Sequence, residues 1–231
     1  MATFRAVGFD LDGTLFDHRG SAEAGVDQFL RTLHVVPSDD ARQAWFAAED
    51  EQFERWRSGR ISFQEQRRAR LRTVLPVLGV TPPAEESKLD ELFEVYFGAY
   101  KEEWRAFPGS EQLLTSLRAS GYRIGLLTNG NEEQQRDKLS NMGLGAAFDV
   151  VCASENIGVQ KPDARAFRIL ADGLGASPSQ CLYVGDNAAH DIAGAEAAGM
   201  RALLVDHYTN GSAAVTEAVL AALKLGPSAV P

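Results

Sequence analysis

The chain has 231 residues, 45% of them hydrophobic, and a formal net charge of −9 at pH 7. This length allows one large domain, or a core domain with a smaller insert, and it suffices for a substantial hydrophobic core. Because proteins that bind nucleic acid usually carry a basic surface, the acidic balance argues against a nucleic acid polymer as the partner.

The cysteines and the N-terminus set two further limits. Cys152 and Cys181 lie in apolar runs and show no zinc-ligand spacing, which is typical of reduced thiols in a cytoplasmic protein. The N-terminus lacks the pattern of a signal peptide, and no apolar run approaches the roughly 20 residues of a membrane span. We therefore expect a cytoplasmic protein with no membrane partner.

The first predicted element is an apolar strand over residues 3–9, which ends in two carboxylates, Asp10 and Asp12. In an extended chain, residues i and i+2 point to the same side, so both carboxylates face one space. Their mutual repulsion favours either a proton on one of them or a cation bound between them, and hard carboxylate oxygens suit Mg²⁺. A calcium loop begins similarly, but Ser21 stands where such a loop carries glutamate.

Residues 17–106 differ in character, with helical periodicity, dense charge and no strand-like run. The predicted helices of this segment are Ala22–Leu33, Asp39–Trp56, Ser62–Leu78 and Glu85–Trp104. Four successive helices suggest a small bundle. We expect this bundle to be an inserted helical cap, with residues 1–16 and 107–231 forming an α/β catalytic core and residues 226–231 a flexible tail.

The insert also carries an arginine-rich stretch over residues 55–72, with arginine at positions 55, 57, 60, 67, 68, 70 and 72. Its principal interpretation is a solvated helix face that pairs in part with nearby glutamates. A second interpretation is that Arg60, in the turn at residues 59–63, reaches a substrate. The sequence does not decide between the two.

After Phe107 strands and helices alternate. The predicted strands are Tyr122–Leu127, Phe148–Cys152, Cys181–Val184 and Arg201–Val205. The predicted helices are Glu111–Ala119, Glu132–Met142, Asp163–Leu174, Asp191–Ala198 and Ala213–Leu223. This alternation predicts an α/β fold with an open, parallel, Rossmann-like sheet and right-handed crossovers.

Polar residues follow the predicted strand ends, where ligands bind in sheets of this kind. These residues are Thr128, Asn129 and Gly130 after the second strand, Asp186 and then Asp191 after the fourth, and Lys161 at a helix start. Packing alone does not predict this combination of carboxylates, hydroxyl and lysine. The pattern indicates a site built for an anion and a cation.

The chain resembles the haloacid dehalogenase-like hydrolase superfamily. The motifs that carry the resemblance are Phe9–Thr14, Leu127–Gly130, Lys161–Pro162, and Val184–Asn187 followed by Asp191–Ala195. They occur in the order and at the spacing of that family, over essentially the whole chain. The helical insert resembles the family's helical cap of the first type, which implies a role in substrate specificity.

The resemblance implies a two-step reaction at the first motif. Asp10 would attack phosphorus and form an aspartyl-phosphate, and Asp12 would act as general acid and then general base. The backbone carbonyl of Asp12 would also bind the metal. Dehalogenases of the family resemble Asp-x-Tyr here, so Asp12 favours phosphorus chemistry.

The other motifs are implied to hold the phosphate and the metal. Thr128 and the amides of Asn129 and Gly130 would bind phosphoryl oxygens, and Lys161 would offset negative charge in the transition state. Asp186 would complete the Mg²⁺ site with Asp10. Asp191 would support either that metal site or the lysine.

These observations predict a Mg²⁺-dependent phosphomonoester hydrolase acting on a small phosphorylated metabolite, either a nucleotide monophosphate or a sugar phosphate. The alternatives are a hydrolytic 2-haloacid dehalogenase, a phosphomutase, and a non-catalytic phosphate-binding module, since fold does not imply function. Monomer and homodimer both stay open.

Overall fold

The structure of the chain is a computed structural model that describes residues 4–224. The chain forms two compact units, an α/β unit from residues 4–18 and 105–224 and a helical unit from residues 19–104. The predicted boundaries, after residue 16 and before residue 107, differ from these by two residues each. The predicted tail, 226–231, lies outside the described residues.

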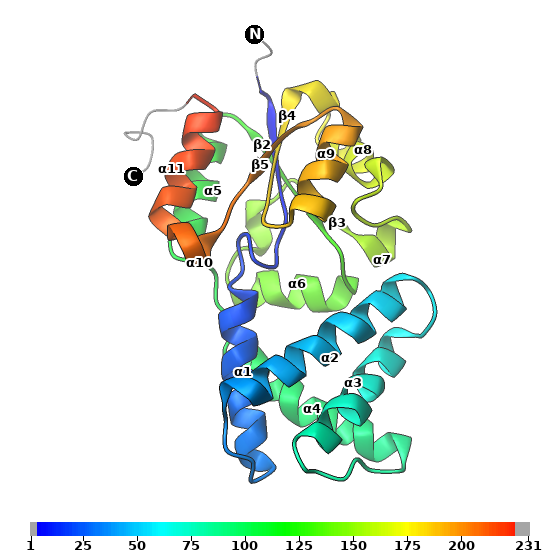
Figure 1. Cartoon of the computed structure of the whole chain (residues 1–231). Coiled ribbons are helices and arrows are strands. Elements are labelled where there is room, and N and C mark those ends of the chain that lie inside the picture. The colour runs from blue at the N-terminus through cyan, green and yellow to red at the C-terminus, as the bar shows by residue number, and fades with distance from the viewer. Residues whose placement is uncertain (1–3, 225–231) are drawn as a thin grey trace. The chain divides into compact units, whose positions relative to one another are not determined.

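A five-stranded sheet forms the centre of the α/β unit (Figure 1). Its strands are β1 (Ala6–Phe9), β2 (Arg123–Thr128), β3 (Val150–Ala153), β4 (Cys181–Gly185) and β5 (Arg201–Leu204). They lie in the order β3-β2-β1-β4-β5, and every neighbouring pair is parallel. The predicted open parallel sheet is confirmed, and β1 at its centre is buried along its whole length, as an apolar run predicts.

Helices cover both faces of this sheet (Figure 1). One face carries α5 (Ser110–Ala119) and α11 (Ser212–Ala222), and the other carries α8 (Ala164–Gly173) and α9 (Ala193–Ala198). After β2 comes α6 (Glu132–Asn141). Four short elements were not predicted, η1 (Gly145–Ala147), α7 (Ser154–Ile157), η2 (Pro178–Gln180) and α10 (His207–Asn210). A single turn is too short to leave a periodic signal in the sequence.

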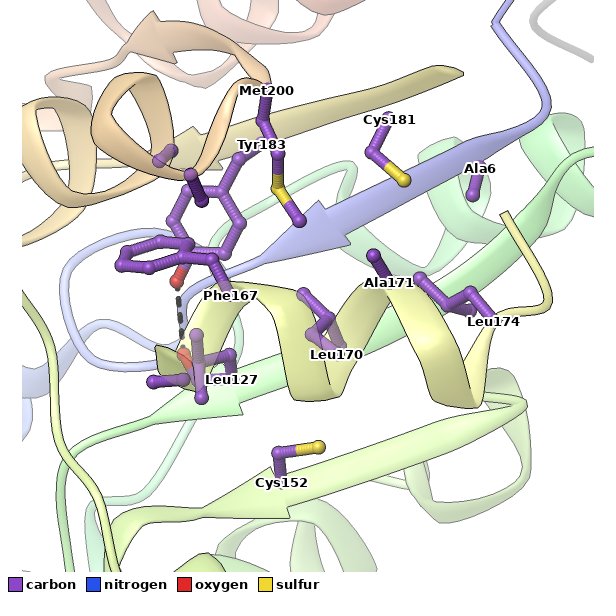
Figure 2. Packing of buried hydrophobic residues seen from close by; sticks show 13 residues of the cluster. Ala6, Leu127, Cys152, Phe167, Leu170, Ala171, Leu174, Cys181, Tyr183 and Met200 are labelled. Carbon is purple, nitrogen blue, oxygen red and sulfur yellow. Dashed lines mark hydrogen bonds between the residues drawn. The ribbon is translucent and has the colours of Figure 1, made fainter. Parts of the chain in front are cut away.

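The core between the sheet and α8 is shown in Figure 2. Phe167 and Leu170 of α8 pack against Leu127 and Tyr183 from the sheet, and all four side chains are fully buried. The Tyr183 hydroxyl donates a hydrogen bond of 2.9 Å to the carbonyl oxygen of Leu127. This satisfies the one polar atom that the ring takes into the core.

Cys152 and Cys181 lie in the same core as buried free thiols (Figure 2). Burial raises the pKa of both thiols, that of Cys181 to about 11. A thiol with a raised pKa is a poor nucleophile, so both cysteines serve packing.

The segment after β4 differs from its prediction. A helix was expected over Asp191–Ala198, but a π-helical turn, η3 (Ala188–Ile192), precedes α9. The Asn187 side chain caps this turn, accepting hydrogen bonds from the backbone amides of Ala189 and His190. The wide turn carries Asp191, and π turns often occur at functional sites.

The helical unit consists of α1 (His18–Thr32), α2 (Asp39–Arg57), α3 (Phe63–Val77) and α4 (Glu86–Glu102). Ser38 and Ser62 cap α2 and α3, each accepting a hydrogen bond from an amide three residues on. The rings of Phe29, Trp45 and Tyr96 meet in its core with centroids 4.2–6.0 Å apart. No described helix is both long and apolar enough to cross a membrane.

The arginine-rich stretch is only partly a solvated face. Arg68 does pair at the surface, with Asp90 at 2.6 Å and with Glu86. Arg70, by contrast, is 2% exposed and pairs with Glu49 at 2.8 Å inside the bundle. The solvated interpretation is therefore wrong for Arg70, because Arg70 lies on the side of α3 that faces the core, where it pairs with the Glu49 carboxylate, whose side chain is 12% exposed.

Candidate active site

The parallel register brings the carboxyl ends of three strands together. Phe9 of β1 is paired with Leu126 of β2 and with Val184 of β4. The next residue, Asp10, is held against β4 by a hydrogen bond of 2.9 Å from its amide to the carbonyl oxygen of Val184. Because all strands point the same way, the residues that follow β1, β2 and β4 meet at one edge of the sheet.

Lys161 joins two of the predicted carboxylates. Its Nζ lies 2.5 Å from Asp10 Oδ1 and 2.7 Å from Asp191 Oδ1, and it also donates to the Tyr183 hydroxyl at 3.3 Å. The side chains of Lys161, Asp10 and Asp191 are 4%, 8% and 1% exposed, so this is a buried ionic cluster. Buried charges of this kind persist only when each is paired.

Asn129 fixes the backbone at Lys161. Its Oδ1 accepts from the Lys161 amide, and its Nδ2 donates to the Lys161 carbonyl oxygen, both at 2.9 Å. The side chain of Asn129 therefore aligns the lysine with the first motif, a contact that sequence reasoning did not predict.

Negative charge is in excess around Lys161. Burial raises the pKa of Asp10 well above its ordinary range, and repulsion from Asp191 and Asp186 adds to this effect, while Lys161 opposes it. Burial, and then the charge of Asp191, raise the pKa of Asp186 to about 6. One lysine does not compensate three neighbouring carboxylates, so the cluster attracts a further cation.

A divalent cation fits this arrangement. Carboxylate oxygens of Asp10, Asp186 and Asp191 all lie within 4.8 Å of one another. Asp186 is exposed, so an ion can reach it. Both oxygens of Asp191 are already engaged, one by Lys161 and the other by the Asn187 amide at 3.0 Å. Of the two roles expected for Asp191, these contacts favour support of the lysine.

Gly13 leaves room for Asp186. A Cβ atom added at Gly13 would lie 2.2 Å from Asp186 Oδ2, much closer than atoms that are not bonded approach. The Gly13 φ of +87° is also one that other residues adopt only with strain. The first motif thus brings its backbone directly against the carboxylate of the fourth.

Asp12 lies in a separate pair. Lys138 of α6 places its Nζ 2.5 Å from Asp12 Oδ1, and Gln135 donates to Asp12 Oδ2 at 2.9 Å. Burial opposes ionisation of Asp12, but Lys138, His18 and Gln135 together outweigh burial and lower the pKa of this carboxyl to about 2. Gln135 also donates to Thr128 Oγ1 at 2.6 Å. Neither Gln135 nor Lys138 was predicted from the sequence as a site residue.

The structure differs from expectation at Gly130. Its amide was expected to bind a phosphoryl oxygen, but it donates to the Ser154 hydroxyl at 3.0 Å. The Gly130 carbonyl oxygen accepts from the Glu155 amide at 3.4 Å. Both groups tie the loop after β2 to α7, an element that the sequence did not predict.

Arg60 belongs to the helical unit, where it is exposed in the turn between α2 and α3. Its backbone amide closes that turn by donating to the Arg55 carbonyl oxygen at 2.9 Å. The role of its side chain stays a prediction.

Comparison with known proteins identifies the family of this chain. The family model described as haloacid dehalogenase-like hydrolase matches residues 4–199. A phosphoglycolate phosphatase from Salmonella typhi is 34% identical over 206 residues, which cover 86% of this chain and 80% of that protein. A phosphoserine phosphatase from Thermus thermophilus is 39% identical over 116 residues, covering 50% of this chain and 46% of that protein.

A solved structure shares the fold. It is the HAD-hydrolase YfnB from Bacillus subtilis bound to magnesium, with a TM-score of 0.76 and 20% identity, covering 88% of this chain and 89% of that one. The likeness at this identity concerns the fold alone. The sequence matches lead to one conclusion: the chain belongs to the haloacid dehalogenase-like hydrolase family and is an enzyme of its phosphatase branch.

Proposed function

We propose that this enzyme is a Mg²⁺-dependent hydrolase of a small phosphomonoester and that it works through an aspartyl-phosphate on Asp10. The observation that carries the proposal is the pair of separately held carboxylates. Asp10 forms an ion pair with Lys161 and lies beside Asp186, whereas Asp12 forms an ion pair with Lys138. Two carboxylates with different partners can take two different roles.

In the first step a carboxylate oxygen of Asp10 attacks phosphorus, and the bond from phosphorus to the ester oxygen breaks. The negative charge of the bound phosphate ester opposes the effect of Lys138 and raises the pKa of Asp12 above its value of about 2 in the free site, so that Asp12 takes up a proton. Asp12 then gives this proton to the ester oxygen, which leaves as an alcohol. Lys161, within 2.5 Å of Asp10, offsets the negative charge that accumulates as the two anions meet. The product of this step is a mixed anhydride on Asp10.

In the second step Asp12, now ionised, takes a proton from water, and the oxygen of that water attacks phosphorus. The bond between phosphorus and the Asp10 oxygen breaks, which releases phosphate and regenerates the carboxylate. The proton on Asp12 serves the next turnover. All atoms balance with the ester and water alone.

Thr128 is suited to bind a phosphoryl oxygen. Its Oγ1 accepts a hydrogen bond from Gln135, so its own hydroxyl hydrogen is available to a ligand. Asn129 contributes by its backbone amide, since its side chain is engaged with Lys161. A role for the Gly130 amide would require it to leave Ser154.

The residues present fit a Mg²⁺ ion. The carboxylates of Asp10 and Asp186 and the backbone carbonyl of Asp12 would hold it, while Asp191 would act through Lys161. When bound, the ion would neutralise charge on the carboxylates and on the phosphate. Three crowded carboxylates with one lysine are the support for this assignment.

The substrate is proposed to be a nucleotide monophosphate or a sugar phosphate. The relatives named above add phosphoglycolate and phosphoserine to the compounds worth testing. The helical unit, residues 19–104, is proposed to act as the cap that selects among them, with Arg60 as a candidate contact. A dehalogenase is disfavoured, because Asp12 offers an acid–base that carbon–halogen chemistry does not need.

The test compares the wild type with Asp10→Asn on p-nitrophenyl phosphate in the presence of Mg²⁺. We expect turnover in the wild type and none in Asp10→Asn, with both proteins folded by circular dichroism. Asp172→Asn, which makes the same chemical change on the exposed side of α8, is the matched control and should retain full activity. Activity in Asp10→Asn would remove Asp10 as the nucleophile.

The substrate class is then ranked on a panel of nucleotides, sugar phosphates, phosphoglycolate and phosphoserine. A wild type inactive on every ester, but releasing halide from chloroacetate, would contradict the proposal. Arg60→Ala should change the ranking on the panel more than the rate on p-nitrophenyl phosphate. An equal loss on all esters would exclude a specificity role for Arg60.

A further inference from the structure

The buried face of α6 is polar, although it packs inside the α/β unit. Gln135 and Lys138 stand three residues apart on this face and are each 2% exposed, next to the apolar Leu139. Residues three apart share one side of a helix. A buried lysine and glutamine are costly unless they are paired, so this face has a partner that compensates them.

The partner is the Asp12 carboxylate, and both of its oxygens are engaged. Lys138 Nζ lies 2.5 Å from Oδ1, and Gln135 Nε2 lies 2.9 Å from Oδ2. Lys138 also lies over the Phe16 ring, 4.7 Å from its centroid. These contacts link residues 123 and 126 positions apart in the sequence, and charge-assisted bonds of this length are the stronger kind.

The pairing of Asp12 with Lys138 prevents the two carboxylates of the first motif from competing for the same cation. Asp10 and Asp12 are two residues apart, so an unpaired Asp12 side chain would compete with Asp10 for Lys161 and for any bound cation. Lys138 gives Asp12 a cation of its own, 2.5 Å away, and leaves Lys161 to Asp10 and Asp191. Each Asp12 oxygen can accept two hydrogen bonds, so one position on Oδ2 stays open for a proton.

We propose that Gln135 and Lys138 are positioning residues that hold the Asp12 side chain in its acid–base orientation and away from the Asp10 cluster. The inference rests on the proposed phosphatase function of the same site. Gln135 links this orientation to the phosphate site, because the same Nε2 donates to Thr128 Oγ1 at 2.6 Å. Neither side chain needs to touch the substrate in this role.

The role predicts a loss that depends on the leaving group. The kcat/KM of an aspartyl-phosphate mechanism reports steps up to the departure of the alcohol. An alkoxide needs protonation by Asp12, whereas p-nitrophenolate leaves readily without it. Lys138→Met should therefore lower kcat/KM on the best alkyl phosphate of the panel by about 10-fold or more, within the roughly 10²–10⁴-fold range of general acid catalysis, and lower it much less on p-nitrophenyl phosphate.

Three further variants make the test specific. Lys138→Arg restores a cation and should recover much of the loss, and Gln135→Met should show the same dependence on the leaving group. Arg136→Met removes a positive charge from the exposed side of the same helix, where Arg136 pairs with Glu132, and should behave as the wild type. All variants are first checked for the wild-type circular dichroism spectrum, and Gln135→Met carries the test if Lys138→Met does not fold.

A double-mutant comparison decides whether the effect passes through Asp12. In an Asp12→Asn background, Lys138→Met should cause no further loss, because the group it positions is gone. Beryllium fluoride with Mg²⁺ should bind Lys138→Met as tightly as the wild type, since phosphate binding is not affected. If the losses in kcat/KM of the two single variants multiply in the double mutant, or if Lys138→Met binds beryllium fluoride more weakly, Lys138 would instead be a phosphate-binding residue. Either result would overturn the inference.

The two proposals fail in different ways. A wild type without Mg²⁺-dependent turnover of any phosphate ester refutes the proposed function and this inference with it. An active wild type whose Lys138→Met variant loses equally on both esters, or matches Arg136→Met, refutes the positioning role alone.

Discussion

Replacing Gly13 by alanine tests the contact between the first and fourth motifs. Gly13 has a φ of +87°, and an added Cβ would lie 2.2 Å from Asp186 Oδ2. A left-handed conformation costs a residue with a Cβ roughly 1–2 kcal/mol. Since such atoms do not approach within 3.0 Å, the Asp186 carboxylate must also move by about 0.8 Å.

That displacement is large for a metal ligand, because ligand distances are held to about 0.2 Å. We expect Gly13→Ala to weaken Mg²⁺ binding by roughly 10–100-fold, the range found when groups that orient ligands are removed. The matched control is Gly121→Ala, whose φ is +85° and whose added Cβ would meet no atom within 4 Å. It carries the same backbone strain without the clash.

Urea unfolding and calorimetric titration with Mg²⁺ separate the two effects. Both variants should lose about 1–2 kcal/mol of unfolding free energy and stay folded, but only Gly13→Ala should bind Mg²⁺ more weakly. Wild-type affinity in Gly13→Ala, or an equal loss of affinity in Gly121→Ala, would refute the argument.

Three other predictions follow from the described contacts. Chelation with EDTA should remove activity and added Mg²⁺ should restore it, and activity that persists in EDTA would exclude the metal role. Burial lowers the pKa of His207, so as the pH falls through about 6.5 the unfolded chain takes up this proton before the folded chain does, and the unfolding free energy of the wild type falls. In urea unfolding, His207→Phe should therefore lose less unfolding free energy than the wild type between about pH 7.5 and 5.5. Equal losses in the two proteins would exclude His207 as a source of this pH dependence. Arg70→Ala removes the 2.8 Å partner of Glu49 and should lower the unfolding free energy by about 3–5 kcal/mol. Arg72→Ala breaks an ion pair at the surface and should lower it by under about 1 kcal/mol. Similar losses in the two variants would contradict the argument that burial of the Arg70 pair makes it the more important one.

The residues of the first and fourth motifs could be found from the sequence because their signal is local. An apolar run that ends in Asp10 and Asp12 marks a strand end, and the side-chain alternation of a strand puts both carboxylates on one side. Alternating strands and helices then imply a parallel sheet whose carboxyl ends meet, which brings in Thr128 and Asp186. No knowledge of packing is needed for these steps.

The surroundings of those residues could not be found in this way. In the sequence, Gln135 and Lys138 are two polar residues of a predicted helix rich in charged residues. Only the packing of α6 shows that they are buried against Asp12. A polar face on a helix that also contains Leu139 was the one available signal. The engagement of the Gly130 amide by Ser154 likewise depends on α7, which is a single turn.

The sequence by itself determined the class of fold, the helical insert and the set of carboxylates, hydroxyl and lysine at the strand ends. Tertiary structure alone decided which of these groups are paired: Lys161 with Asp10 and Asp191, Lys138 with Asp12. The physical reason is the separation along the sequence over which each effect acts. Strand alternation and helical period act over a few neighbouring residues, whereas the pairing of charges depends on contacts between residues 30 to 151 positions apart, which exist only once the sheet and its helices have packed.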